Sequence, residues 1–409
     1  MTLSVNHKAF PSSDLVLLDH GEAVHINQVE SCLTQLWRSA SEHSQQEGKG
    51  ALALARLWNL VSYHTGPQAP PPASGDDTGD GTANDTGDVT GDVPEPPGAL
   101  LERVTMSIPA RVIHLLHLQG DPPPGPGMEV EARVGNHCLI SHAGSRMVCC
   151  EAIHLTGYGA AGQSHFPAVL RALLVPHLPV ALLWLDEVPH RSRLLGELLG
   201  MSDRMLVDTQ RTSDTSSLLA VHDLMRNAGG QIVDLGWLRL RPMRHLVADF
   251  FDPPGRAEQL EKLEGIAIET SPKGLNSGLM MAGWVLSRLG LGESQGLIPV
   301  QGEGNLRWKM AHGAGVFPLD FSIREGYGGL DEIFRFELRA GGDVFEIRDV
   351  DPEHVAVSGP DRQLPRIALR ESEEAELVVA ALGGAPADAV FAKALGVAAH
   401  LVETLQWSQ

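Results

Sequence analysis

Three glycines in the segment "GYGAAG" form the clearest chemical pattern of the chain, at positions 157, 159 and 162. The segment lies between a run typical of a strand and a run with helical spacing. In dinucleotide-binding folds such glycines let backbone N–H groups approach a pyrophosphate at the start of a helix. Asp186 follows the next predicted strand, where a ribose-binding carboxylate would lie. Gly157, Gly159, Gly162 and Asp186 are therefore candidate cofactor-binding residues.

A glycine-rich turn also forms without any ligand, because glycine tolerates backbone conformations that other residues avoid. The preceding strand contains "CCEAIH", whereas the first parallel strand of a nucleotide-binding sheet is usually apolar throughout. Two interpretations remain at this point. The chain is either an NAD(P)-binding enzyme or nucleotide sensor, or a protein whose glycine turn holds no cofactor.

Cysteine and histidine side chains suggest metal binding around residues 137–154, where His137, Cys138, Cys149, Cys150 and His154 occur. The adjacent Cys149 and Cys150 point to opposite faces of a strand. The chain also lacks paired C-x-x-C motifs and an H-E-x-x-H motif. We therefore expect buried structural cysteines and no metal.

Recognisable catalytic motifs are missing: the chain has no G-x-S-x-G, G-x-x-x-x-G-K-[ST] or kinase pattern. Asp203, Asp208 and Asp234 lie near the ends of predicted strands, where ligands often bind in α/β sheets. Carboxylates at such positions also cap helices and pair with arginines. We favour this structural role, which leaves no catalytic set.

Apolar periodicity predicts an α/β fold with a mixed sheet that contains a parallel strand–helix unit, followed by a smaller α+β C-terminal domain. The predicted strands are 57–64, 111–118, 129–134, 146–155, 179–185, 204–208, 265–270, a hairpin over 331–350, 354–359 and 366–370. The predicted helices are 26–40, 164–175, 192–200, 214–227, 276–289, 372–382 and 387–405.

Residues 66–98 form a separate acidic segment that contains no Lys or Arg and repeats TGD three times. Its composition cannot bury enough apolar surface to offset the entropy of ordering, so we expect it to be disordered. The expected organisation is an N-terminal helix and strand over 1–65, this insertion, the rest of the α/β domain over 99–255, and the C-terminal domain over 256–409.

Overall charge limits the classes of partner. The chain has 51 acidic and 31 basic residues and a net charge of −20, which argues against nucleic acid and anionic lipid as partners. The most apolar stretch, 166–185, is interrupted by arginine, histidine and prolines, unlike a membrane span. Four cysteines without a paired motif and no signal peptide favour a cytoplasmic location.

Several segments together resemble the glucose-6-phosphate dehydrogenase assembly protein family, OpcA. The resemblance covers roughly residues 20–65 and 99–290. It is carried by "LARLWNLVSY", "IPARVIHLLHL", "VCCEAIHL", "LRALLVPHLPVALLWLDEV", "MSDRMLVDTQRTSD", "DLGWLRLRPMRHLVADFFDPP" and "LMMAGWVLSRLG".

This resemblance implies a non-catalytic protein without a cofactor, which assembles and allosterically activates glucose-6-phosphate dehydrogenase in the oxidative pentose phosphate pathway. The family pattern contains neither the glycine fingerprint nor the acidic insertion. The thioredoxin control of phototrophic members is not extended to this chain, because no cysteine follows Cys150.

The strongest matching segment, residues 234–252, holds a basic and aromatic cluster in this acidic chain. The pattern predicts an extended piece over Leu238–Arg241 and a helix from Pro242 to Asp252. The guanidinium groups of Arg239, Arg241 and Arg244 would repel one another unless carboxylates or a partner lie between them. We predict structural ion pairs among Arg239, Arg204, Asp208 and Asp234, and partner contacts through Trp237, Arg241, Arg244 and His245.

Overall fold

The computed structural model divides the chain into two compact units, Met1–Leu183 and Trp184–Gln409, which we describe separately. This division differs from the boundary after residue 255 inferred from the sequence, which stays a prediction. The residues that the structure describes are 15–18, 23–46, 51–66, 97–120, 130–140, 146–212, 214–227, 231–291, 298–302, 305–312, 315–324, 333–370, 372–384 and 388–406. The predicted insertion at 66–98 therefore lies almost wholly outside them.

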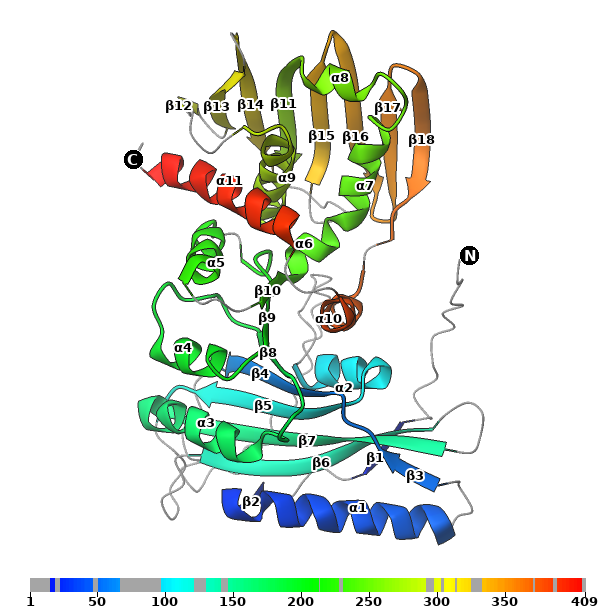
Figure 1. Ribbon diagram of the computed structural model, residues 1–409, viewed down its shortest axis with the longest axis vertical. Coiled ribbons are helices and arrows are strands. Elements are labelled where there is room, and N and C mark those ends of the chain that lie inside the picture. Colours follow the sequence, from blue (N-terminus) through cyan, green and yellow to red (C-terminus); the bar gives the residue numbers. More distant parts are fainter. Residues whose placement is uncertain are drawn as a thin grey trace, which may run out of the picture. The chain divides into compact units, whose positions relative to one another are not determined.

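The first unit is a mixed sheet with helices (Figure 1). Its elements are β1 (Leu15–Leu18), β2 (Ala23–Val24), η1 (Ile26–Gln28), α1 (Val29–Gln46), β3 (Ala51–Leu54), β4 (Trp58–Gly66), α2 (Pro97–Ser107), β5 (Ala110–Leu118), β6 (Val130–Ile140), β7 (Arg146–Tyr158), α3 (Gly159–Leu173) and β8 (Val180–Trp184).

Strands β4, β5 and β7 are the parallel centre of this sheet, whose order is β1-β6-β7-β5-β4-β8. Strand β6 joins β7 in the antiparallel direction, so the sheet is mixed, as predicted. Most of the central residues are buried, because parallel strands are usually covered on both faces. Helix α3 contributes Phe166, which is fully buried and packs edge-on against Tyr63 of β4 with 6.4 Å between ring centroids.

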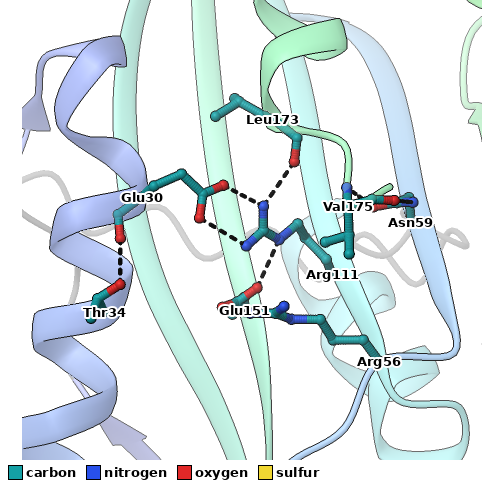
Figure 2. A network of polar contacts seen from close by, with 8 residues as sticks. All are labelled: Glu30, Thr34, Arg56, Asn59, Arg111, Glu151, Leu173 and Val175. Carbon is teal, nitrogen blue, oxygen red and sulfur yellow. Dashed lines mark hydrogen bonds and ion pairs between the residues drawn. The ribbon is translucent and has the colours of Figure 1, made fainter. Parts of the chain in front are cut away.

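Arg111 on β5 holds a buried ionic network together (Figure 2). Its guanidinium is hydrogen-bonded to the Glu151 carboxylate on β7 at 2.7 Å and to the Leu173 carbonyl oxygen at 2.8 Å. It also donates to Glu30 on α1, and Arg56 binds the second oxygen of Glu151. Arg111 and Glu151 are only 3% and 5% exposed. One side chain therefore ties two strands, the end of α3 and helix α1 to one another.

The second unit begins with a strand–helix region and continues into a large sheet (Figure 1). Its elements are α4 (Arg193–Leu199), β9 (Arg204–Val207), α5 (Ser216–Asn227), β10 (Gln231–Asp234), α6 (Leu235–Arg239), α7 (Arg241–Asp249), α8 (Ala257–Leu260), β11 (Leu263–Thr270), α9 (Leu275–Arg288), β12 (Ile298–Gly302), β13 (Asn305–His312), β14 (Gly315–Ile323), β15 (Ile333–Ala340), β16 (Asp343–Asp351), β17 (His354–Gly359), β18 (Arg362–Ala368), α10 (Glu374–Gly383) and α11 (Ala389–Gln406). Strands β9 and β10 are parallel neighbours joined through α5.

The large sheet has the order β12-β13-β14-β11-β15-β16-β17-β18 and is antiparallel except for β11 and β14. Helices α9 and α11 lie against one face, which we call the inner face. The Trp308 indole N–H donates to the Thr404 hydroxyl of α11 at 2.8 Å. A Cβ at Gly278 of α9 would lie 2.9 Å from the Phe321 ring. Phe250, which follows α7, stacks on Phe345 of the same face.

Helices α9 and α11 approach each other closely at Gly283. A Cβ at this position would lie 2.4 Å from the Ala394 carbonyl oxygen, a distance that real Cβ contacts essentially never show. The glycine therefore allows the two helix backbones to pack together over the sheet.

The sequence prediction was wrong about residues 238–241, which are not extended: Leu235–Arg239 form helix α6, and α7 begins at Arg241. Alternating Leu and Arg suggested a strand, but the Asp234 carboxylate accepts the Gly236 N–H at 3.1 Å and starts a helix. The next helix ends at Asp249 and not at Asp252. Strands β12, β13 and β14 were not predicted, and helix α2 was also missed.

The buried network gives a prediction about stability. Replacing Arg111 with alanine leaves the buried Glu151 with Arg56 as its remaining ionic partner, so we expect a loss of about 3 kcal/mol or more in the free energy of unfolding. The control substitution is Glu30→Gln. Glu30 also binds Arg111, but its side chain is 57% exposed. This control should cost about 1 kcal/mol or less. Urea denaturation of the two variants tests the difference, and equal losses would contradict a central role for Arg111.

Candidate functional site

The basic cluster of the sequence lies at the end of β10 and along α6 and α7. Its first residue, Asp234, is 1% exposed. The Asp234 carboxylate accepts the backbone N–H of Thr209 at 3.0 Å, the Thr209 hydroxyl at 2.8 Å and the N–H of Gly236. It therefore joins the loop after β9 to the start of α6. The predicted pairing of Asp234 with an arginine is corrected, because these neutral donors occupy its oxygens.

The Asp234 carboxyl has an unusual pKa for an aspartate. Burial raises its pKa to about 6, and repulsion from the nearby Asp208 acts in the same direction. The donors of Thr209 and Gly236 oppose this shift by stabilising the ionised form. The folded protein therefore holds this proton more tightly than the unfolded chain does.

Arg239, at the end of α6, lies against Asp208 after β9. The guanidinium donates to both carboxylate oxygens of Asp208, at 2.8 Å and 3.3 Å, and to the Gln210 side chain. Burial alone would raise the pKa of Asp208, but the charge and hydrogen bonds of Arg239 outweigh it and hold that pKa below its ordinary value. This bidentate contact lies in the interior of the second unit, since the Asp208 side chain is 5% exposed.

Arg244 lies over the indole of Trp237, with the guanidinium carbon 3.4 Å from the ring centroid. It also donates to the Trp237 carbonyl oxygen. Trp237 itself is 3% exposed, and its indole N–H donates to Asp388 at 2.8 Å. Asp388 accepts backbone N–H groups at the start of α11. Arg244 of α7, Trp237 of α6 and Asp388 before α11 therefore connect the three helices through a cation–π contact and a hydrogen bond.

Arg241 and His245 lie on the exposed side of α7, while Met243 and Val247 of the same helix are buried. These two exposed side chains and the half-buried Arg244 are cationic or ionisable groups on one helix of an acidic protein. The three arginines of the cluster therefore have different surroundings: Arg239 binds a carboxylate, Arg244 covers an indole and Arg241 faces solvent.

Arg204, at the start of β9, was predicted to form a structural ion pair, and the structure shows contacts with the end of α10. Its guanidinium donates to the backbone carbonyl oxygens of Ala381, Leu382 and Gly384 at the end of α10, and to the Gln231 side chain. Burial lowers its pKa. The carbonyl groups at a helix C-terminus carry partial negative charge, so they are suitable partners for a guanidinium.

The glycine segment lies between β7 and α3, as predicted, and the Phe166 ring of α3 packs against it. A Cβ at Gly157 would lie 2.7 Å from the Phe166 ring and 3.0 Å from the backbone of Gly162. Gly159 has a φ of +57°, and its carbonyl oxygen lies 3.2 Å from the His117 ring nitrogen. Close packing and backbone conformation therefore account for these glycines. Asp186 follows β8 and belongs to the second unit.

The strand register places His137 opposite Cys150 and Cys138 opposite Cys149, but among the described side chains no group of three or more His, Cys, Asp or Glu residues could hold a metal ion. Cys149 is disulfide-bonded and fully buried, whereas Cys150 is a buried free thiol. The His154 ring packs edge-on against His114 at 5.8 Å. Burial lowers the pKa of His114 to about 3, and repulsion by His154 and His64 adds to the effect, so this imidazole is neutral. The side chains of His137 and Cys138 lie outside the described residues.

Two family models match this chain. Residues 102–223 match the glucose-6-phosphate dehydrogenase subunit N-terminal domain, an OpcA assembly domain. Residues 230–395 match the C-terminal domain of the same subunit. The chain belongs to the OpcA family. The α6–α7 cluster falls inside the C-terminal match, whereas most of the parallel strands of the first unit fall inside the N-terminal match.

Curated OpcA relatives align over part of the chain. The protein named "Putative OxPP cycle protein OpcA" of Nostoc punctiforme is 28% identical over 192 residues, which cover 46% of this chain and 40% of that protein. The protein of the same name from Synechococcus elongatus is 32% identical over 201 residues, covering 47% and 42%. The chain therefore spans about two fifths of the length of the relatives it matches.

Solved structures give only a weak likeness. A 3-ketoreductase from Actinomadura kijaniata is 14% identical with a TM-score of 0.38, and covers 61% of this chain and 82% of that chain. A score this low carries no argument about activity. The OpcA match instead argues against the alternative interpretation of residues 157–162 as a nucleotide site.

Some important residues were missed by sequence reasoning. Asp388 was not recognised as the N-cap of the last helix. The available signal is its position directly before an apolar helical run, which is a typical N-cap pattern. Asn276 is fully buried, and its amide donates to the carbonyl oxygens of Thr209, Thr212 and Asp214. Nothing in the local sequence marks this contact, because its partners lie about 60 residues away.

Asp234 predicts a specific dependence of stability on pH. The native state binds its proton with a pKa of about 6, against about 3.9 for an unfolded aspartate. Between these values the folded chain holds more protons, so stability falls as the pH rises from about 4 to about 6, by roughly 3 kcal/mol. Asp208 acts in the opposite sense, but only below its ordinary pKa.

Asp234→Asn should remove this fall, because asparagine keeps the carbonyl acceptor for the two backbone N–H groups and does not titrate. Denaturation curves at pH 4, 5, 6 and 7 measure it. The control is Asp223→Asn, an exposed position on α5. A fall of the same size in the Asp234 variant as in the parent would show that other groups cause it.

Proposed function

We propose that this protein assembles and allosterically activates glucose-6-phosphate dehydrogenase, without catalysing a reaction itself. The observation that carries the proposal is the pair of matches to the two domains of the glucose-6-phosphate dehydrogenase subunit family, over residues 102–223 and 230–395. Two further observations agree with the proposal: the sequence has no recognisable catalytic motif, and the Phe166 ring packs against the glycine turn.

The proposal places the protein in the oxidative pentose phosphate pathway, as a cytoplasmic partner protein that needs neither a bound cofactor nor a metal. The names of its relatives refer to that pathway. None of the helices that the structure describes combines the length and apolar character needed to cross a bilayer. The net charge of −20 disfavours nucleic acid as a partner.

The contact surface that we propose on α7 consists of Arg241, Arg244 and His245. Arg241 and His245 are exposed, and an arginine is a favoured anchor at protein interfaces. Trp237 contributes indirectly, because its buried ring supports the Arg244 guanidinium in one orientation. Arg239, Asp208, Asp234 and Arg204 would support this region from inside the second unit.

The function is tested by mixing purified chain with the dehydrogenase of the same organism. We expect co-elution in size-exclusion chromatography and a dehydrogenase activity that rises until the chain is in stoichiometric excess. The chain alone should show no turnover and no NADP⁺ binding in calorimetry. Absence of both co-elution and activation would reject the assembly role. NADP⁺ binding that Gly159→Ala abolished would favour the nucleotide sensor instead.

The α7 surface gives a second test with the same assay. Arg241→Ala combined with His245→Ala should weaken dehydrogenase binding about tenfold or more, with a melting temperature close to that of the parent. The matched control is Arg226→Ala, an exposed arginine on α5. If the double variant binds and activates as well as this control, the α7 surface is not the contact.

A further inference from the structure

The large sheet of the second unit has an outer face, opposite the one that α9 and α11 cover. Along β13, β14, β11, β15 and β16 its described charged residues include six cations, Arg307, Lys309, Arg324, Arg335, Arg339 and Arg348, and five acids, Glu269, Asp320, Glu337, Glu346 and Asp351. The side-chain alternation of the strands places them there, because Trp308, Phe321, Phe336 and Phe345 occupy the inner positions between them.

The cations of this outer face cover its acids. Arg335 binds both Glu337 and Glu346, Arg307 binds Asp320, and Arg324 binds Glu269. The carboxylate side chains are 10% to 24% exposed, whereas the side chains of the arginines that bind them are 39% to 65% exposed. Long guanidinium side chains therefore lie over short carboxylates, and an approaching molecule meets mainly positive charge.

The sheet is shaped to hold one of these arginines flat. Gly265 of β11 lies opposite Arg339 of β15 in the register. A Cβ at Gly265 would lie 2.8 Å from a terminal nitrogen of the Arg339 guanidinium. The glycine therefore makes room for that guanidinium to lie along the sheet surface, beside Glu337.

Lys309 and Arg348 extend the positive charge beyond these ion pairs. Both side chains are exposed, and among the described contacts neither is joined to a carboxylate. Arg348 lies opposite Arg335 in the β15–β16 register, an arrangement of like charges that costs stability. These exposed cations contrast with the net charge of −20 over the whole chain.

We propose that the outer face of the large sheet is a docking surface for an acidic, folded surface of the dehydrogenase. This proposal rests on the proposed function and deepens it by naming a second contact surface. Electrostatic complementarity is the argument: the outer face is cation-rich, and an acidic partner surface would compensate the unpaired Lys309 and Arg348. Complementary charge speeds association and makes binding sensitive to salt.

Other occupants fit this face less well. A second copy that packed its own outer face here would bring cations against cations. Nucleic acid would meet the carboxylates of the face and a strongly acidic chain around it. A partner protein with an acidic patch avoids both conflicts.

The test uses the full chain and the double charge reversal Lys309→Glu, Arg348→Glu. These positions lie outside the ion pairs of the face, so we expect a melting temperature close to that of the parent. The matched control is Arg226→Glu, Lys393→Glu, which makes the same charge change at exposed positions of α5 and α11. Dehydrogenase binding is measured by calorimetry or biolayer interferometry at about 50 mM and about 300 mM salt, roughly bracketing physiological screening.

We expect the outer-face variant to bind the dehydrogenase about tenfold more weakly at low salt, with a smaller difference at high salt, while the control binds like the parent. Equal binding by the two variants overturns the inference, provided that the parent binds. A parent that does not bind at all rejects the proposed function instead. Unchanged dehydrogenase binding together with loss of self-association in sedimentation would assign the face to a second copy, and would also overturn the inference.

Discussion

A buried carboxylate at the end of a short strand determines how the second unit is connected. Asp234 is almost completely removed from water, yet three donors from two segments converge on its oxygens. Burying a carboxyl is costly unless its lone pairs are satisfied, so the loop after β9 and the first turn of α6 must adopt these positions together. The arrangement starts α6 directly from the strand and sets where Trp237 and Arg239 lie.

The polar contacts of α6 connect it to other elements of the second unit. Trp237 reaches Asp388, which caps α11, and α11 in turn packs on the inner face of the large sheet. Arg239 binds Asp208 on the loop that Asp234 also holds. The same short helix therefore couples the parallel strand pair to the helices that cover the sheet. A substitution at its buried positions would disturb several elements, whereas one at the exposed positions of α7 would not.

Arginine has two separate uses in this acidic protein. Arg111 and Arg239 lie in the interior and join elements through bidentate or multiple hydrogen bonds, for which a planar guanidinium is well suited. The arginines of α7 and of the outer sheet face instead present charge to the surroundings. Both exposed cationic regions occur in a chain of net charge −20, and both are proposed here as contact surfaces.

The sequence by itself determined the class of the fold, its main strands and helices, and the family. Apolar periodicity is local, so runs such as Ala110–Leu118 and Leu275–Arg288 could be assigned from neighbouring residues. It failed at residues 238–241, where alternation of Leu and Arg resembled a strand, although the Asp234 carboxylate caps a helix that starts at Leu235. Strands β13 and β14 show the same alternation of large apolar and charged residues, and it was not recognised there.

Only the tertiary structure decided which charges meet. Arg239 and Asp208 are 31 residues apart, Arg111 and Glu30 are 81 apart, and Trp237 and Asp388 are 151 apart. No local pattern specifies such pairs, because they depend on strand order and register. The same reason applies to the outer sheet face: its cations come from three strands and the residue after β14, and each is unremarkable in its own segment. They form one surface only because the sheet brings alternate residues of neighbouring strands side by side.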